Sequence, residues 1–206
     1  WCQKDGENAR VHYGAANGKN KELPQSHGID HETSYLKIEN RFARLTGLKA
    51  DTLYDFVIRD SNSESRRFSF KTAPEGAADF AFAAGGDSRN HRDARQRANR
   101  IVAKIRPLFV CFGGDMISKS THDHWAAWLD DWQLTTGKDG RMVPIIAARG
   151  NHESKSDIHS FFDTPHADDY YAVGFGGDFL RIYTLNSNIV RGGDQGKWLA
   201  DDLASN

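Results

Sequence analysis

The chain has 206 residues, enough for one large domain or two small ones. Its 27 Lys and Arg residues balance 28 Asp and Glu residues, which gives a formal net charge of −1. This balance argues against a nucleic-acid-binding face or a basic membrane-binding surface. No apolar run reaches the roughly 18 residues of a membrane span, and no signal peptide is visible. The two cysteines, Cys2 and Cys111, are too few for a disulfide framework.

The first part of the chain has the pattern of short strands joined by turns. Apolar and polar residues alternate within it, and this period of two is typical of half-buried strands. The alternating segments are residues 9–13, 36–39, 54–58 and 68–71. We interpret residues 1–74 as an antiparallel β-sandwich, followed by a short linker that contains Pro74 and Gly76.

From residue 77 the pattern changes to short apolar runs that alternate with helical segments. The runs cover residues 80–84, 108–112 and 143–148, and a further strand is expected over 179–185. Apolar spacing predicts helices over residues 94–105, 125–132 and 196–203. This alternation predicts a parallel sheet with covering helices, an α/β domain over 77–206. Trp125, Trp128 and Trp132 are interpreted as a buried helix face rather than a base-stacking platform.

Each of the three apolar runs ends in glycine followed by a polar residue of a type that binds metals. The pairs are Gly86-Asp87, Gly114-Asp115 and Gly150-Asn151. Because the carboxyl ends of parallel strands meet at one edge, the three side chains are expected to lie close together. Carboxylate and amide oxygens suit hard or borderline divalent ions. A single Gly-Asp pair is ordinary turn chemistry, but three in order favour a metal site.

These residues carry a family resemblance. The blocks that contain Asp87, Asp115 and Asn151-His152-Glu153 resemble the first three blocks of the calcineurin-like metallophosphoesterases. The start of the chain resembles the fibronectin type III-like domain of the purple-acid-phosphatase-like branch, in which a corner tyrosine, here Tyr54, binds nearby backbone. Residues 170–199 resemble the downstream stretch of the family. The resemblance implies a fibronectin type III-like β-sandwich without its first strand, then a partial α/β metallophosphoesterase domain with layered sheets and flanking helices.

The resemblance also implies a role for each matched residue. Asp87 would bind the first of two divalent metal ions, Asp115 would bridge both, and Asn151 would bind the second. The ions would be iron, zinc, manganese or similar. His152 would contact the phosphoryl group or protonate the leaving oxygen. Glu153 is expected to support His152 rather than to bind metal.

The sequence departs from the family pattern in two places. Ser118 stands where purple enzymes have a tyrosine, so no purple ferric centre is expected. Arg89 stands where many relatives have the histidine of an Asp-x-His block. Arg89 is a candidate for binding the substrate phosphate, and a structural role is an equal alternative. His91, on the same loop, is a candidate to replace the missing nitrogen ligand.

The resulting functional hypothesis is a phosphomonoesterase that uses a dinuclear metal centre and a metal-bound hydroxide. Two alternatives stay open: a phosphodiesterase or nucleotide hydrolase on the same core, and a non-catalytic adhesion or carbohydrate-binding protein. The family's later histidine blocks are not found up to Asn206, so we expect a fragment that is inactive by itself. A secreted, periplasmic or cell-surface location is implied by the resemblance only.

Overall fold

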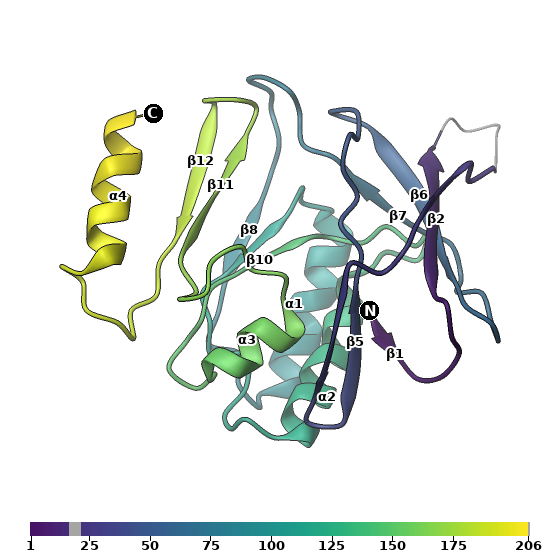
Figure 1. Cartoon of the computed structure of the whole chain (residues 1–206), viewed down its shortest axis with the longest axis horizontal. Coiled ribbons are helices and arrows are strands. Elements are labelled where there is room, and N and C mark those ends of the chain that lie inside the picture. The colour runs from purple at the N-terminus through teal and green to yellow at the C-terminus, as the bar shows by residue number, and fades with distance from the viewer. Residues whose placement is uncertain (17–21, 206) are drawn as a thin grey trace.

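The computed structural model describes residues 1–16 and 22–205, and its first half forms two antiparallel sheets. One sheet has the order β1–β5–β4 and the other the order β3–β2–β6–β7 (Figure 1). Their bounds are β1 Cys2–Gln3, β2 Arg10–Ala15, β3 Gln25–His27, β4 His31–Tyr35, β5 Ile38–Phe42, β6 Leu53–Arg59 and β7 Phe68–Lys71. The antiparallel arrangement agrees with the expected sandwich. Its assignment to the fibronectin type III class, and the domain boundary at residue 74, stay predictions.

The predicted strand over residues 36–39 is wrong at its start. Leu36 and Lys37 form the two-residue turn between β4 and β5, where Tyr35 pairs with Ile38. Both turn residues have positive φ, 50° and 61°, as a type I′ hairpin turn requires. The Leu36 side chain packs against buried core residues, and its carbonyl lies 2.7 Å from Nδ1 of His122. These tertiary contacts hold a leucine in a conformation that its local sequence does not favour.

The corner residue Tyr54 makes the hydrogen bond that the resemblance implies. Its hydroxyl accepts the backbone N–H of Lys49 at 2.9 Å. The ring belongs to the buried cluster of Val11 and Tyr13, and Trp1 packs against this cluster. The first residue of the chain thus contributes to the core of the sheets.

A parallel sheet forms the centre of the second half. Strands β8 (Ala83–Gly85), β9 (Val110–Phe112) and β10 (Ile145–Ala147) pair in parallel in the order β10–β9–β8. The register places Gly85, Phe112 and Ala147 level with one another. The predicted parallel sheet is therefore confirmed, and its three strands end together.

Different elements pack on the two faces of this sheet. Phe112 and Ala147 share a core with α2 (His122–Trp132) and α3 (Lys155–Phe161). Within α2, Trp125 and Trp128 are buried, which confirms the tryptophan face. Phe109 and Ile146 pack instead against β11 (Tyr171–Phe175).

The predicted strand near residues 179–185 exists, but it lies outside the parallel sheet. β12 (Leu180–Thr184) pairs antiparallel with β11 in a separate two-stranded sheet. Beyond this hairpin, α4 (Asp194–Ser205) lies at the edge of the molecule (Figure 1). Trp198 of α4 packs its ring 5.0 Å from that of Tyr170. A 3-10 turn, η1 (Gln133–Thr135), extends α2.

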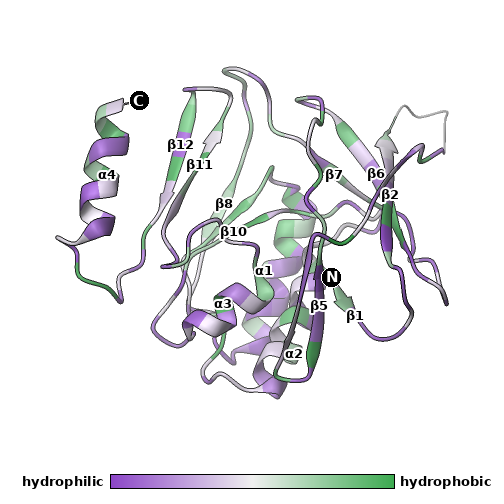
Figure 2. Cartoon of the chain, viewed as in Figure 1, coloured by the Kyte–Doolittle hydropathy of each residue, from purple (hydrophilic) through white to green (hydrophobic). Residues whose placement is uncertain are grey.

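Helix α1 (Arg92–Ile105) forms where it is predicted, but it buries unexpected residues. The apolar positions that predict the helix are largely outward: Ile101 and Ile105 are 54% and 60% exposed. Arg95 and Asn99 are buried instead, and α1 packs with this polar side against α2 and η1. Figure 2 displays the hydropathy of the helices and strands. Arg95 on this buried polar side binds the backbone carbonyl of Arg89, a candidate site residue.

The two halves share a core. Ile38 of β5 belongs to the buried cluster of Phe112 and Trp125. Thr33 of β4 donates a hydrogen bond of 2.8 Å to the carbonyl of Ser160 in α3. Within the described residues, no helix is long and apolar enough to cross a membrane.

Candidate metal centre

The loops after β8, β9 and β10 meet at one edge of the parallel sheet and carry Asp87, Asp115 and Asn151. Backbone hydrogen bonds join the first two loops. Asp87 N–H donates to the carbonyl of Gly114 at 2.8 Å, and Arg89 N–H donates to that of Asp115 at 3.0 Å. The third loop joins through His152, whose N–H donates to Oδ1 of Asp115 at 3.2 Å. The fold thus brings the predicted residues together, while their roles stay predictions.

Two glycines allow these loops to approach so closely. A Cβ atom at Gly114 would lie 2.3 Å from the nitrogen of Gly150, and Gly114 has a φ of +88°. A Cβ atom at Gly150 would lie 2.0 Å from Oδ1 of Asp115. Both positions therefore require glycine, because any side chain would push the loop after β9 away from the loop after β10.

The carboxylate of Glu153 accepts backbone hydrogen bonds from the loop after β9 and from the loop after β10. Its side chain is buried, at 2% exposure. One carboxylate oxygen accepts the N–H groups of Asp115 and Gly150, each at 2.9 Å. The other accepts those of Met116 at 2.7 Å and Ile117 at 3.3 Å. Glu153 was expected to support His152, but its hydrogen bonds hold the backbone of the two loops instead.

Arg89 lies between the two carboxylates. Its Nε donates to Oδ1 of Asp87 at 2.6 Å, and its Nη2 donates to Oδ2 of Asp115 at 3.2 Å. The hydrogen bond with Asp87, the largest influence, and the neighbouring negative charges raise the pKa of Arg89. The guanidinium keeps its charge at any ordinary pH. Arg89 thus contacts both carboxylates. Its roles in phosphate binding and in structure stay predictions.

A buried ion pair that sequence reasoning missed fixes the backbone of Arg89. Arg95 donates a short hydrogen bond to the carbonyl of Arg89. The guanidinium of Arg95 also binds the carboxylate of Asp131 through Nε at 3.0 Å and Nη2 at 2.5 Å. Their side chains are 3% and 1% exposed. The spacing of Arg95 and Asn99, four residues apart on one helical face, was the available signal of a buried polar side.

His152 is held through one ring nitrogen. Nδ1 lies 3.0 Å from the carbonyl oxygen of Ser118. Since a carbonyl oxygen only accepts, Nδ1 carries the hydrogen and Nε2 is the atom that can hold or transfer a proton. Ser118, at the position of the purple enzymes' tyrosine, therefore contributes its carbonyl to the histidine.

The other candidate histidine, His91, takes no part in the hydrogen bonds described above. His91 is exposed and directly precedes α1 without a side-chain cap hydrogen bond. His124 Nε2 lies 3.0 Å from the side-chain nitrogen of Asn90, on the loop that carries Arg89. Across residues 1–16 and 22–205, no group of three or more His, Cys, Asp and Glu side chains could hold a metal ion.

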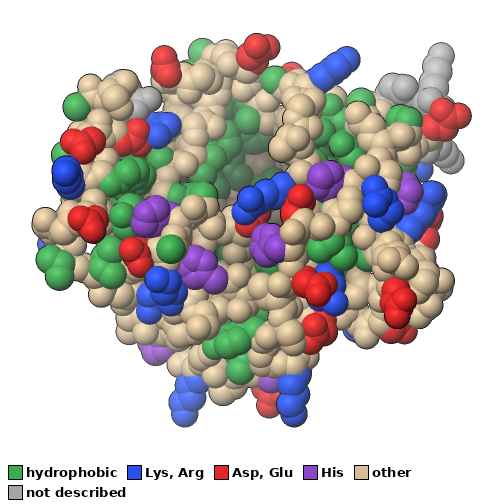
Figure 3. Space-filling view, viewed as in Figure 1, with side chains coloured by type: hydrophobic (Ala, Val, Ile, Leu, Met, Phe, Trp, Pro, Cys, Tyr) green, Lys and Arg blue, Asp and Glu red, His purple; other side chains and the backbone are tan. Residues whose placement is uncertain are grey.

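The donor set nevertheless fits a hard divalent ion. The carboxylates of Asp87 and Asp115 already converge on a positive group, Arg89. Asn151, which is exposed, adds an amide oxygen on the neighbouring loop. Two carboxylates and an amide supply oxygen ligands of the kind that magnesium, manganese or calcium prefer. In Figure 3, side chains of both charges and histidines are interspersed over the face shown.

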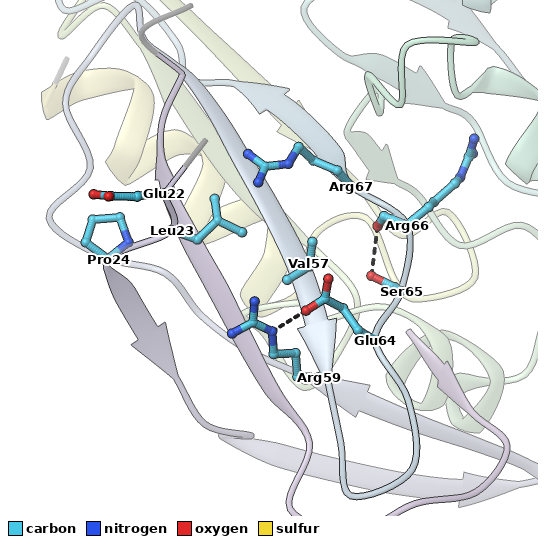
Figure 4. Close-up of a pocket in the computed structure, with 9 residues that line it drawn as sticks. All are labelled: Glu22, Leu23, Pro24, Val57, Arg59, Glu64, Ser65, Arg66 and Arg67. Carbon is cyan, nitrogen blue, oxygen red and sulfur yellow. Dashed lines mark hydrogen bonds and ion pairs between the residues drawn. The ribbon is translucent and has the colours of Figure 1, made fainter. Parts of the chain in front are cut away.

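A separate pocket of about 580 Å³ lies on the first half of the chain. Figure 4 shows its lining, which includes none of the predicted site residues. Arg59 there pairs with Glu64, and Arg67 pairs with Asp55 at 3.2 Å. Each of these two arginines therefore has an acidic partner within the fold.

Comparison with known proteins agrees with the α/β fold. Residues 86–204 match the family model described as calcineurin-like phosphoesterase. A solved structure titled "Structure of PhoD" superposes with a TM-score of 0.72 at 14% sequence identity, covering 98% of this chain. The chain spans 54% of that structure's length. No curated protein sequence matches the chain.

The family match covers more than half of the chain. The chain therefore belongs to the calcineurin-like phosphoesterase family, a class of metal-dependent phosphoester hydrolases. The structural similarity to PhoD concerns the fold alone at this identity. Membership of the purple-acid-phosphatase-like branch within the family stays a prediction.

Proposed function

We propose that the chain carries part of the active site of a metal-dependent phosphomonoesterase. The observation that carries this proposal is the meeting of Asp87, Asp115 and the Asn151-His152 pair at one edge of three parallel strands. Asp115, Asn151 and Asp87 are the candidate ligands for a divalent ion. The chemistry that such an ion supplies is Lewis-acid activation of water and of the phosphoryl oxygens.

His152 would donate a proton to the departing oxygen of the substrate. The hydrogen bond from Nδ1 to Ser118 fixes the ring, which leaves Nε2 for the proton transfer. Arg89 would bind a phosphate oxygen through Nη1, because Nε and Nη2 hold the carboxylates of Asp87 and Asp115. A guanidinium with two fixed nitrogens presents the third in a defined direction.

Hydrolysis of a chromogenic phosphomonoester, with and without a chelator, by a purified form of the protein that includes the family's later histidine blocks tests this proposal. We expect metal-dependent release of phosphate that Asp115→Asn abolishes, with the exposed Asp178→Asn as the matched control. Cleavage of phosphodiesters alone would favour the alternative hydrolase. No cleavage of either class would leave the non-catalytic alternative. Residues 1–206 by themselves are a separate sample in the same assay, and we expect no hydrolysis from them, because they lack the family's later histidine blocks.

His152→Asn separates proton donation from simple binding. We expect a rate loss of about 10²- to 10⁴-fold with an alkyl phosphate, the usual contribution of a general acid. The loss should be smaller with a nitrophenyl phosphate, whose leaving group needs no proton. Equal losses with both substrates would contradict the role of His152. Secretion stays a prediction from the resemblance.

A further inference from the structure

The carboxylate of Asp115 has two different sides. β9, which it follows, is the middle strand of the order β10–β9–β8. Asp87 lies on the β8 side and Asn151 on the β10 side. A cation between Asp87 and Asp115 would occupy one side, and a cation between Asp115 and Asn151 would occupy the other.

The guanidinium of Arg89 already occupies the β8 side. It binds Oδ1 of Asp87 at 2.6 Å and Oδ2 of Asp115 at 3.2 Å. A metal ion on that side would compete with Arg89 for these oxygens. The side chain is 39% exposed, so the pair also faces the solvent from which a substrate arrives.

The fold fixes Arg89 in this position. Its φ is 37°, a conformation that a non-glycine residue adopts only when its surroundings enforce it. Its N–H donates to the carbonyl of Asp115, and its own carbonyl accepts from the buried Arg95. Arg95 is in turn held by Asp131. Hydrogen bonds on both sides of the peptide therefore aim the Arg89 side chain at the carboxylates.

We propose that Arg89 is the permanent positive charge on the β8 side of Asp115, and that this chain takes up a single divalent ion on the Asn151 side. A fixed guanidinium repels a second cation from the same two carboxylates. The inference rests on the proposed metal-dependent function and differs from the predicted pair of ions. Arg89 then neutralises phosphate charge in place of one metal ion.

Titration of the metal-free protein with Mn²⁺, with free ion measured by electron paramagnetic resonance, tests the proposal without any assay of activity. We expect one Mn²⁺ per chain. Arg89→His replaces the guanidinium by a ligand and should raise the number to two, with magnetic coupling between neighbouring ions. Arg97→His, on the exposed side of α1, is the matched control and should keep the number at one.

Two further variants keep the arginine and locate the ion. Asn151→Ala should weaken Mn²⁺ binding by at least about 10- to 100-fold, because loss of a direct ligand should cost no less than loss of a residue that only supports a ligand. Asp87→Asn should weaken it far less. Equal effects of both variants, two ions in the unaltered protein, or one ion in a folded Arg89→His variant would each overturn the proposal.

The outcome can be separated from that of the proposed function. One ion per chain with no phosphoester hydrolysis would contradict the function and leave the role of Arg89 intact. Hydrolysis with two ions per chain would contradict the role of Arg89 and leave the function intact. Thermal unfolding of each variant confirms that it is folded before it is titrated.

Discussion

The buried carboxylate of Glu153 accepts the backbone N–H of Asp115 at 2.9 Å. The same oxygen accepts the N–H of Gly150 on the neighbouring loop. One side chain thus fixes the distance between the loop after β9 and the loop after β10. This contact therefore helps to set the position of Asp115 relative to Asn151.

Replacement of Glu153 by Gln should separate the two loops. An amide offers one acceptor oxygen and places a donor against backbone N–H groups, so buried donors lose their partner. We expect the free energy of unfolding to fall by about 3 kcal/mol or more, given that hydrogen bonds to charged groups contribute most. Urea unfolding measures this loss. Glu75→Gln, at an exposed site in the linker, is the control, and a loss equal to the control would contradict the role of Glu153.

Replacement of Asp131 by Asn should destabilise the protein and loosen Arg89. Arg95 would keep a buried charge without its counter-ion, which typically costs about 3–5 kcal/mol. The neighbouring Asp130 is 71% exposed and contacts Arg92 only at the surface. Asp130→Asn is therefore the matched control, with an expected cost of about 0–1 kcal/mol. Similar unfolding free energies for the two variants would show that the buried pair is not important for stability.

Replacement of Tyr54 by Phe should remove the corner hydrogen bond to Lys49 and leave the ring packing intact. The expected loss is about 1 kcal/mol in the free energy of unfolding, the usual net contribution of such a bond. Tyr13→Phe serves as the control, because Tyr13 packs in the same cluster and its hydroxyl has no hydrogen bond among the described residues. An unchanged denaturation midpoint for Tyr54→Phe would contradict this expectation.

Asp163 should make the contact between the two halves sensitive to acid. Two hydrogen bonds from Arg44, each 2.6 Å, hold the pKa of Asp163 below its ordinary value. A carboxylate with a lowered folded-state pKa contributes its stability above the unfolded pKa of about 3.9 and loses it as the pH falls through the folded pKa. The difference in unfolding free energy between the protein and Asp163→Asn should therefore shrink below about pH 4. Denaturant unfolding from neutral to acidic pH measures it, and a pH-independent difference would refute the assignment.

Sequence reasoning located much of the candidate site because each ligand type follows an apolar run and a glycine. That pattern depends on short-range chemistry: a buried parallel strand is apolar throughout, and glycine permits the turn that exposes the next residue. Asp87, Asp115 and Asn151 could therefore be found without coordinates. The tryptophans of α2 were equally evident, since their spacing matches one helical face.

The sequence by itself indicated a strand-rich first half, an α/β second half with a parallel sheet, and the residues at the edge of that sheet. The tertiary structure alone decided that Arg89 lies between two carboxylates. It also decided that the buried ion pair of Arg95 and Asp131 holds the backbone carbonyl of Arg89. It also decided that Leu36 turns a hairpin and that α1 buries a polar side. These features depend on partners far away in the chain, and local hydrophobic patterns carry no information about which buried charges will meet. The near-neutral net charge of −1 likewise gives no indication that opposite charges lie within hydrogen-bond distance at the candidate site.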